Sequence, residues 1–261
     1  CGAIGILLPN GPTIFNVAIR TLQMQGNNAI YGVGGGITWD SKWEAEYEET
    51  RQKSAILYRQ NPRFDFISTG RIHQGKLLHL KEHLNRLQES SRYFAYPFNK
   101  KEVQNQVEDL CQSLDFDTDY RLKLSLAKDG KLTFEHAQLT ELDDDFCQAR
   151  LVKQTHPLNN PYTYFKTSYR PHISLGPHEQ IYYNQKKELL ETSIGNLVLK
   201  IKDQLYTPPV HLGLLNGIYR QSLIANNQVT EKVLTLEDLK QAQAIYGCNA
   251  VRGLYELRVD F

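Results

Sequence analysis

Two titratable residues give the sequence its clearest indication of chemistry. Lys166 stands in the aromatic run from Tyr162 to Tyr169. If these rings are buried with it, the amine loses water, its pKa falls, and it becomes a nucleophile able to form a Schiff base. Glu191 precedes small, turn-forming residues, and a carboxylate can keep the nitrogen of a pyridine ring protonated. Without further context, a surface lysine and an ordinary glutamate at a strand end remain open as alternatives.

A second group of residues is suited to binding phosphate. The guanidinium of Arg86 can bind phosphate through two nitrogens, with a solvated helix position as the alternative. Gly217 and Ile218 stand at an expected helix start, where backbone N–H groups and the helix dipole attract anions. Asn249 and Ala250 can add further donors. Together these residues predict an anion site in the C-terminal half of the chain.

A glycine-rich segment near the N-terminus, Gly32-Val33-Gly34-Gly35-Gly36-Ile37, matches neither common nucleotide motif. A dinucleotide fingerprint needs glycine where Ile37 stands, and a P-loop ends in Gly-Lys-Ser/Thr. The bare backbone N–H groups can hold an anion such as a carboxylate, or the segment is a tight turn. Glu46 and Glu49 lie three apart on an expected helix and can share a divalent cation, with a solvated acidic face as the alternative.

Histidine and cysteine residues indicate structure rather than chemistry. His79 and His83 have helical i, i+4 spacing, but the residues between them lack the order found in zinc proteases. Cys248 is expected to be a small buried residue, because no activating base is evident beside it. The cysteines include no C-x-x-C pair, which favours a reducing, cytoplasmic location; they are Cys1, Cys111, Cys147 and Cys248.

The composition is that of a soluble globular protein. Of 261 residues, 41% are hydrophobic and 23% are charged, which excludes a disordered tail, a collagen-like rod and a coiled coil. The formal net charge of +1 gives no field that would favour nucleic acid or an anionic membrane. No apolar run approaches the roughly 20 residues of a membrane span. The first residues resemble a strand entered midway and lack Met, so we expect a longer parent chain.

The chain divides into three segments of different texture, with a polar linker at 58–62. They cover residues 1–57, 63–156 and 157–261. In the last two segments strands and helices alternate without an internal repeat, which predicts an α/β (α+β) fold of two domains. The first segment is a shorter piece made of strands and one helix.

Hydrophobic periodicity and turn signals predict the individual elements. Strands are expected over 3–8, 13–22, 29–33, 64–69, 76–78, 122–126, 132–134, 197–201 and 254–261, with a hairpin turn at Asp129-Gly130. Helices are expected to begin at Ser41, where Glu44 completes a capping box, near Leu80, at Asn99 and at Gly217.

The N-terminal segment resembles the last part of the chorismate-binding enzymes, a family that contains anthranilate synthase and aminodeoxychorismate synthase component I. The resemblance rests on motifs at 15–21, 31–37, 40–41 and 45–50. It implies that substrate carboxylates are held by Arg20 and the backbone of Gly34, Gly35 and Gly36. It places Glu46 and Glu49 at a magnesium ion. Most of that domain, including its other metal carboxylate, is missing from residues 1–57, so the resemblance implies an inactive remnant with no intact metal site.

Residues 63–261 resemble the pyridoxal-phosphate enzymes of fold type IV, the branched-chain aminotransferase fold. Motifs in the family's order stand at 82–87, 165–167, 190–196, 206–209, 213–220 and 249–253. The resemblance makes Lys166 the Schiff-base lysine and Glu191 the partner of the pyridine nitrogen. It assigns the cofactor phosphate to Arg86, Gly217, Ile218, Asn249 and Ala250. Thr69, on a family strand that faces the site, would assist proton delivery.

Three activities of that family remain open: aminodeoxychorismate lyase, branched-chain aminotransferase and D-amino acid aminotransferase. The motifs at 216–221 and 248–250 are most similar to the lyase. The preceding chorismate-enzyme segment favours the same reaction, because synthase and lyase act consecutively in making 4-aminobenzoate for folate. Two departures from the family pattern concern the substrate side: Ile173 replaces a common Tyr, and Tyr219 replaces a frequent Thr.

The resemblance also implies partners. The substrate would be 4-amino-4-deoxychorismate, cleaved to 4-aminobenzoate and pyruvate by a homodimer that binds neither nucleic acid nor membrane. A glutamine amidotransferase subunit is expected for a full-length synthase–lyase. A catalytically inactive module that only dimerises its synthase stays open as the non-enzymatic alternative.

Overall fold

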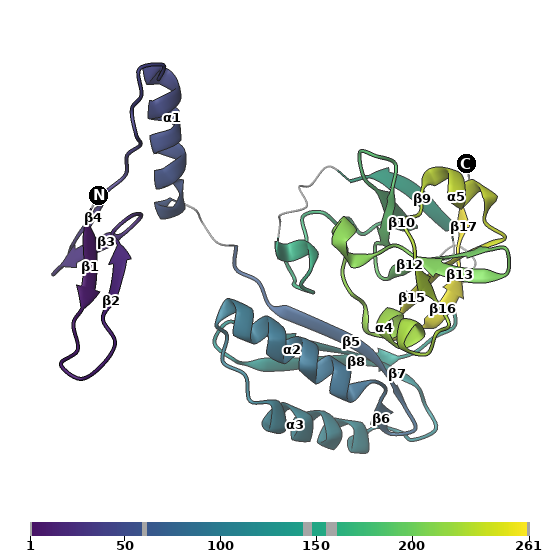
Figure 1. The fold of residues 1–261 in the computed structure, drawn as a ribbon. Helices are drawn as coiled ribbons and strands as arrows, with labels where there is room; N and C mark the ends of the chain where they lie inside the picture. Colours follow the sequence, from purple (N-terminus) through teal and green to yellow (C-terminus); the bar gives the residue numbers. More distant parts are fainter. Residues whose placement is uncertain (1, 59–61, 143–147, 155–160, 260–261) are drawn as a thin grey trace. The chain divides into compact units, whose positions relative to one another are not determined.

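The computed structural model describes residues 2–58, 62–142, 148–154 and 161–259 (Figure 1). The chain forms two compact units, Cys1–Pro62 and Arg63–Phe261. Cys1, Cys147 and the expected boundary at 156–157 lie outside the described residues. None of the helices formed by the described residues has the length and apolar character of a membrane span.

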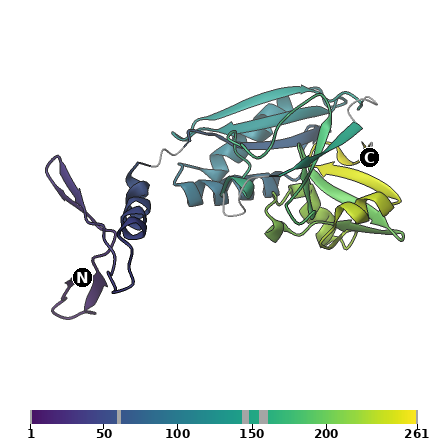
Figure 2. The same ribbon diagram turned by 90° about the horizontal axis from the view of Figure 1, so that it is seen from above.

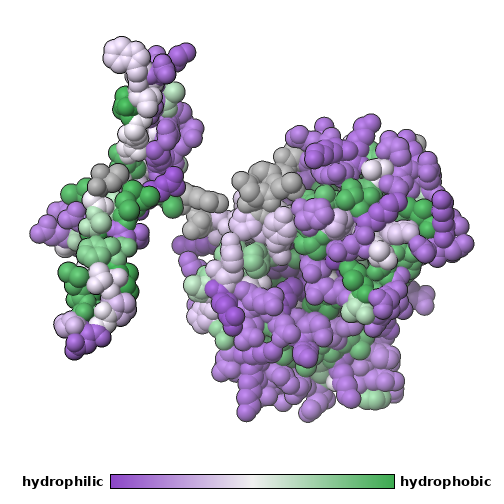
Figure 3. Space-filling model, viewed as in Figure 1, coloured by the Kyte–Doolittle hydropathy of each residue, from purple (hydrophilic) through white to green (hydrophobic). Residues whose placement is uncertain are grey.

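The N-terminal unit consists of two hairpins and a helix. β1 (Ala3–Ile6) pairs with β2 (Ile14–Val17), β3 (Leu22–Gln25) pairs with β4 (Asn28–Tyr31), and α1 (Trp43–Ser54) continues into the short 3-10 helix η1 (Ala55–Leu57). No described residue of this unit is buried, and large apolar side chains lie on its surface (Figure 3). The described residues of this unit therefore form no buried core, and two-stranded hairpins are only marginally stable by themselves.

The strand expected over 13–22 is interrupted. β2 ends at Val17 and β3 begins at Leu22, and Arg20 between them has a φ of 47°. A left-handed residue cannot continue a strand, and apolar periodicity does not report it.

The capping box expected at Ser41 is wrong. α1 begins at Trp43 after Lys42, and no side chain caps it. The Ser41 hydroxyl instead accepts the N–H of Thr38 at 3.0 Å and donates to Glu46 Oε1 at 2.7 Å. Because of these bonds, the Ser41 hydroxyl does not cap the backbone N–H groups at the start of α1.

The first half of the C-terminal unit is an antiparallel sheet covered on one face by two helices (Figures 1 and 2). The sheet has the order β6 (Lys76–Leu77), β5 (Phe66–His73), β7 (Tyr120–Leu126), β8 (Leu132–Gln138), and the helices are α2 (Leu80–Phe94) and α3 (Lys100–Ser113). As predicted, Asn99 caps α3 by accepting the N–H of Glu102. Alternate residues of β5 and β7 enter the core, which leaves the opposite face, with Thr69, for a site.

The second half is a larger mixed sheet. Its order is β14 (Thr230–Glu231), β13 (Gln204–Thr207), β12 (Asn196–Ile201), β11 (Leu189–Thr192), β10 (Glu179–Tyr183), β9 (Gln148–Lys153), β17 (Arg258–Val259), and β15 (Ala244–Asn249) pairs with β12 and β16 (Gly253–Glu256). The helices are α4 (Ile218–Ala225), α5 (Leu236–Gln241), η2 (Pro161–Thr163) and η3 (Val210–Leu212). The strand expected over 254–261 is divided at buried Leu257, because β16 pairs with β15 and β17 pairs with β9. The predicted α/β (α+β) class is confirmed.

Candidate functional site

Lys166 lies at the interface between the two halves of the C-terminal unit. Its carbonyl accepts the N–H of Ile67 on β5 at 2.8 Å, and the N–H of Ser168 donates to the Asp65 carbonyl at 2.8 Å. The lysine segment therefore extends the first sheet as an added short strand. This pairing fixes where the lysine side chain enters the pocket.

All the residues predicted for this site line one pocket. They are Thr69, Arg86, Lys166, Glu191, Gly217, Ile218, Asn249 and Ala250. They come from β5, α2, the segment after η2, β11, the N-terminus of α4 and the end of β15 with the turn that follows it. Distant parts of the sequence therefore meet here. Two further polar residues of the lining, Arg170 and Asn196, were missed as functional residues by sequence reasoning.

The amine of Lys166 is poised to act as a nucleophile. Burial disfavours its charged form and lowers its pKa to about 7, and the guanidinium groups of Arg86 and Arg170 act in the same direction. The carboxylate of Glu191 opposes them. A large fraction of the amine is therefore uncharged at neutral pH, as a carbonyl-binding lysine requires.

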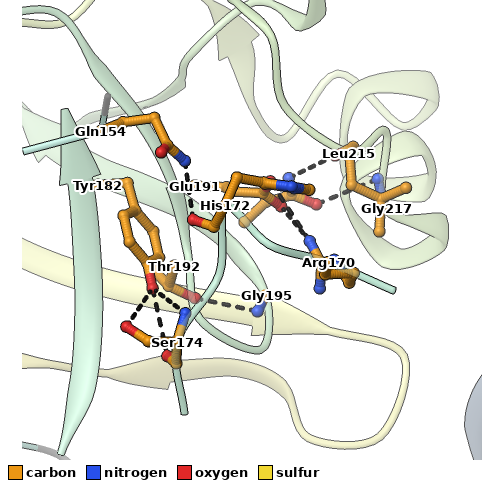
Figure 4. A network of polar contacts seen from close by, with 11 residues as sticks. Gln154, Arg170, His172, Ser174, Tyr182, Glu191, Thr192, Gly195, Leu215 and Gly217 are labelled. Carbon is orange, nitrogen blue, oxygen red and sulfur yellow. Dashed lines mark hydrogen bonds and ion pairs between the residues drawn. The ribbon is translucent and has the colours of Figure 1, made fainter. Parts of the chain in front are cut away.

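Glu191 supplies a buried carboxylate across the pocket. Nη2 of Arg170 lies 3.4 Å from each of its oxygens (Figure 4), and the backbone N–H of Leu215 also donates to it. Burial raises the pKa of the Glu191 carboxyl, and Arg170 is the largest influence that lowers it. The only sequence signal for Arg170 is its place in the run that contains Lys166.

Arg86 is held on α2 by a chain of buried polar groups. Its Nη2 donates to Ser68 Oγ at 2.9 Å, and Ser68 Oγ lies 2.7 Å from His83 Nδ1. Burial lowers the pKa of His83 well below its usual value, with the charge of Arg86 adding to the effect. The imidazole is therefore neutral, and Ser68 Oγ bonds both its Nδ1 and the guanidinium of Arg86. His83 thus positions Arg86, a role that helical spacing alone did not indicate.

The N–H of Gly217 is not free for an anion, contrary to the sequence expectation. It donates to Asn196 Oδ1 at 3.1 Å, while Asn196 Nδ2 donates to the Leu215 carbonyl at 2.7 Å. A Cβ on residue 217 would clash with Asn196 Oδ1, so glycine is needed for this close approach. The first N–H that α4 can offer a ligand is that of Ile218.

The turn at Asn249 and Ala250 is fixed from both sides. Asn249 Oδ1 accepts the N–H groups of Val251 and Arg252 at 2.9 Å each. The Ala250 carbonyl accepts the N–H of Arg71 on β5 at 3.2 Å. This turn is therefore a second connection between the two sheets, beside the pocket.

A wider cavity of about 470 Å³ opens next to this pocket. Thr69, Lys166 and Arg170 border both spaces, and the apolar side chain of Ile173 lines the wider one. The basic residues of the lining are Arg121, Lys123, Lys166, Arg170 and Arg252, and none of the described lining residues is acidic. Tyr219, the second residue that departs from the expected pattern, packs against His79, and the centroids of the two rings lie 6.2 Å apart.

The N-terminal unit brings part of the predicted remnant site together. Lys53 Nζ donates to the Gly34 carbonyl at 2.9 Å and pairs with Glu49 at 2.6 Å. A Cβ on Gly35 would lie 3.1 Å from Glu46 Oε2. The glycine loop therefore lies against the side of α1 that carries both glutamates.

Other predicted residues of this remnant lie apart from those contacts. A Cβ on Gly36 would meet nothing within 4 Å, and Arg20 is exposed. Across the described part of the chain, no group of three or more His, Cys, Asp or Glu residues is arranged to hold a metal ion.

The C-terminal pocket fits pyridoxal phosphate. The cofactor presents an aldehyde, a pyridine nitrogen and a phosphate, and the pocket offers an amine, a buried carboxylate and a guanidinium. The buried Nε of Arg86 has no hydrogen-bond partner among the described residues, which is the feature expected of a donor awaiting an anion. Lys166 would hold the aldehyde carbon, Glu191 the ring nitrogen, and Arg86 with the Ile218 N–H the phosphate.

The first prediction concerns the reactivity of Lys166. In cofactor-free protein, trace acetylation of this amine should reach half its maximal rate near pH 7 because burial lowers its pKa to about 7, whereas an unperturbed lysine side chain in a model peptide has a pKa of about 10.4. Peptide mass spectrometry after labelling at several pH values measures both. Glu191→Gln should move the midpoint lower still, since the carboxylate favours the ammonium. A midpoint that coincides with the exposed lysines contradicts the burial of this amine.

The second prediction concerns the contact between Gly217 and Asn196. Gly217→Ala should reduce the free energy of unfolding by about 1–3 kcal/mol through overpacking. Asn196→Ala removes the obstructing oxygen, and the next atom, Arg220 Cβ, would lie at 3.8 Å. The double variant should therefore lose less than the sum of the single losses in urea unfolding. Additive losses would show that the two residues do not meet.

The third prediction concerns acid stability. Unfolded His83 binds a proton near pH 6.5, whereas the buried imidazole resists it, so the free energy of unfolding should fall as pH drops below about 6.5. Asn at position 83 can accept from Ser68 but does not titrate. His83→Asn should reduce the fall between pH 7 and 5 in urea unfolding. The exposed His136→Asn serves as the control and should keep it; an unchanged slope in His83→Asn refutes the assignment.

Two family models match different parts of the chain. The family model described as amino-transferase class IV matches residues 66–258. The model of the chorismate binding enzyme family matches residues 1–59.

Curated relatives fall into the same two groups. The "Putative aminodeoxychorismate lyase" of Schizosaccharomyces pombe is 22% identical over 196 residues, which cover 69% of this chain and 84% of that protein. Anthranilate synthase component 1 of Lactococcus lactis is 45% identical over 58 residues, 22% of this chain. The chain spans only 13% of that synthase and 12% of its counterpart in Cereibacter sphaeroides.

Solved structures share the fold. The "Putative amino-acid aminotransferase" of Mesorhizobium loti has a TM-score of 0.68 at 25% identity and covers 76% of this chain and 100% of its own. The "Putative 4-amino-4-deoxychorismate lyase" of Legionella pneumophila has a TM-score of 0.64 at 19% identity, covering 79% and 84%. The chain therefore belongs to the class IV aminotransferase family of pyridoxal-phosphate enzymes, and its N-terminal segment is similar to the chorismate-binding enzymes.

Proposed function

We propose that the C-terminal unit is a 4-amino-4-deoxychorismate lyase, which releases 4-aminobenzoate and pyruvate for folate synthesis. The observation that carries the proposal is the charge of the wider cavity, whose described lining holds five basic residues and none that is acidic. The substrate has a six-membered hydrocarbon ring with one carboxylate, and its enolpyruvyl group carries a second. Ile67, Ile173 and Val251 of the same lining suit the ring.

The aminotransferase alternatives make different demands on this cavity. A branched-chain amino acid has one carboxylate and an apolar side chain. Arg170 already pairs with Glu191 and Lys123 with Glu135, so a single carboxylate would leave Arg121 or Arg252 without an anionic partner. A D-amino acid aminotransferase that uses an acidic amino acid is a closer competitor. The Thermotoga maritima protein, a "putative branched-chain amino acid aminotransferase" with a TM-score of 0.66 at 20% identity, shares only the fold with this chain.

The chain's residues divide the chemistry of the lyase among them. When bound, pyridoxal phosphate supplies an aldehyde for the substrate amine and a ring that accepts electrons from the substrate's C4. Lys166 Nζ takes the proton from C4 as a general base, which its lowered pKa permits at neutral pH. Glu191 keeps the ring nitrogen protonated. The electron pair left at C4 would then break the bond between ring carbon C3 and the enolpyruvyl oxygen, which makes the ring aromatic. Thr69, which borders both cavities, would assist delivery of a proton to the methylene carbon of the departing group, giving pyruvate.

The proposal extends to the whole protein and its partners. Residues 1–59 are similar to chorismate-binding enzymes, and this fits a bifunctional synthase–lyase in which the first site makes the substrate of the second. For that protein we expect a cytoplasmic location, a homodimer, and a glutamine amidotransferase subunit that supplies ammonia. Residues 1–57 alone would be inactive.

The fourth prediction tests the reaction. The chain with pyridoxal phosphate should release pyruvate from 4-amino-4-deoxychorismate in an assay coupled to lactate dehydrogenase. Lys166→Ala should lower that rate by about 10²–10⁴-fold or more, because it loses both the covalent attachment and the general base. It should also lose the visible absorption band of the bound cofactor.

Two outcomes would overturn the proposal. Rapid transamination of amino acids with 2-oxoglutarate, without pyruvate from aminodeoxychorismate, would establish an aminotransferase. No visible absorption with pyridoxal phosphate would overturn the lyase and favour the catalytically inactive dimerisation module.

A further inference from the structure

Arg170 is a charged residue of the site to which the proposed reaction gives no role. Its side chain borders both the cofactor pocket and the wider cavity. Nη2 lies 3.4 Å from Glu191 Oε1 and 3.4 Å from Oε2, and the side chain is 17% exposed. Its buried Nε has no hydrogen-bond partner among the described residues. Burying a guanidinium costs desolvation free energy unless the group pairs with an anion.

Glu191 depends on this guanidinium for its charge. The carboxylate is buried, and burial alone favours the protonated acid. Its other close donor is the Leu215 N–H, which carries no charge. A protonated Glu191 has lost the negative charge that would keep a pyridine nitrogen protonated.

Lys166 is affected in the opposite direction. A positive neighbour disfavours the ammonium, so Arg170 and Arg86 both help to keep the amine free. The charged groups that face the amine are Arg86 from α2, Arg170 from its own segment and Glu191 from β11. His83, which is linked to Arg86 through Ser68, is neutral. The other nearby cations line the wider cavity and not the cofactor pocket; they are Arg121, Lys123 and Arg252.

We propose that Arg170 is the positioning residue that sets both charge states of the site: it holds Glu191 as an oriented carboxylate and keeps Lys166 as an uncharged amine. The inference requires only the pocket geometry, so it applies to a lyase and to an aminotransferase alike. Failure of the proposed lyase reaction therefore leaves it standing.

The fifth prediction separates the two effects of Arg170. In the full chain labelled with ¹³C at glutamate carboxyls, the Glu191 signal is the one that Glu191→Gln removes. Arg170→Gln should move the titration of that signal to higher pH, and Arg170→Lys, which keeps a charge, should restore part of the shift. A titration unchanged in Arg170→Gln overturns the first half of the proposal.

The effect on Lys166 is measured where Glu191 cannot titrate. In a Glu191→Gln background, adding Arg170→Gln should raise the pH midpoint of Lys166 acetylation. At pH values well below the midpoint, a rise of one unit would cut the uncharged fraction about tenfold. Arg121→Gln, which removes a cation from the wider cavity only, is the matched control and should leave the midpoint in place. No rise with Arg170→Gln, or an equal rise with Arg121→Gln, overturns the second half.

Circular dichroism verifies that each variant is folded. If Arg170→Gln does not fold, Arg170→Met offers a side chain of similar length without charge, and the same two titrations apply. Reduced affinity for pyridoxal phosphate in the holoenzyme should accompany either shift, and unchanged affinity with unchanged titrations identifies Arg170 as merely structural.

Discussion

The pairing of the Lys166 segment with β5 is the constraint on which the C-terminal unit's chemistry depends. The lysine's main chain belongs to the first sheet, whereas Glu191 and Ile218 belong to the second half. The bond from Arg71 to Ala250 joins the halves again on the other side of the pocket. The functional side chains therefore share one space only while the two halves are docked, and neither sheet contains a complete site.

The electrostatics of the pocket follow from this assembly. Docking the halves places Lys166, Arg86 and Arg170 around a single buried carboxylate, and in a medium of low dielectric such like charges repel strongly. The conflict is relieved where a proton can leave, which is the amine of Lys166. It persists at the two guanidinium groups, each with a buried Nε that lacks a partner among the described residues. A pocket with these properties is prepared for an anionic ligand.

Much of this could be predicted from the sequence, because the signals were local. Residues close together in the sequence predict the helical spacing on α2, the Asn99 cap and the β7–β8 hairpin. The structure confirms each of these. The motifs around Lys166 and Glu191 likewise identified residues that the structure brings together. The predictions that failed depended on contacts between residues far apart in the sequence.

Gly217 shows why such contacts escape a reading of the sequence. A glycine before a helix suggests a free N–H, but the partner that occupies it, Asn196, lies on another strand. Arg170 was missed for the same reason, because its role depends on a close contact with Glu191, which is distant in the sequence. Ser41 failed as a cap because its hydroxyl had nearer partners in Thr38 and Glu46.

The absence of buried residues in the described part of the N-terminal unit has a thermodynamic consequence. The heat capacity change of unfolding is proportional to the surface newly exposed to water. Hairpins and a helix that already expose their apolar side chains add little to it. Calorimetry of this chain would therefore register essentially one transition, that of residues 63–261, with a heat capacity change too small for its length.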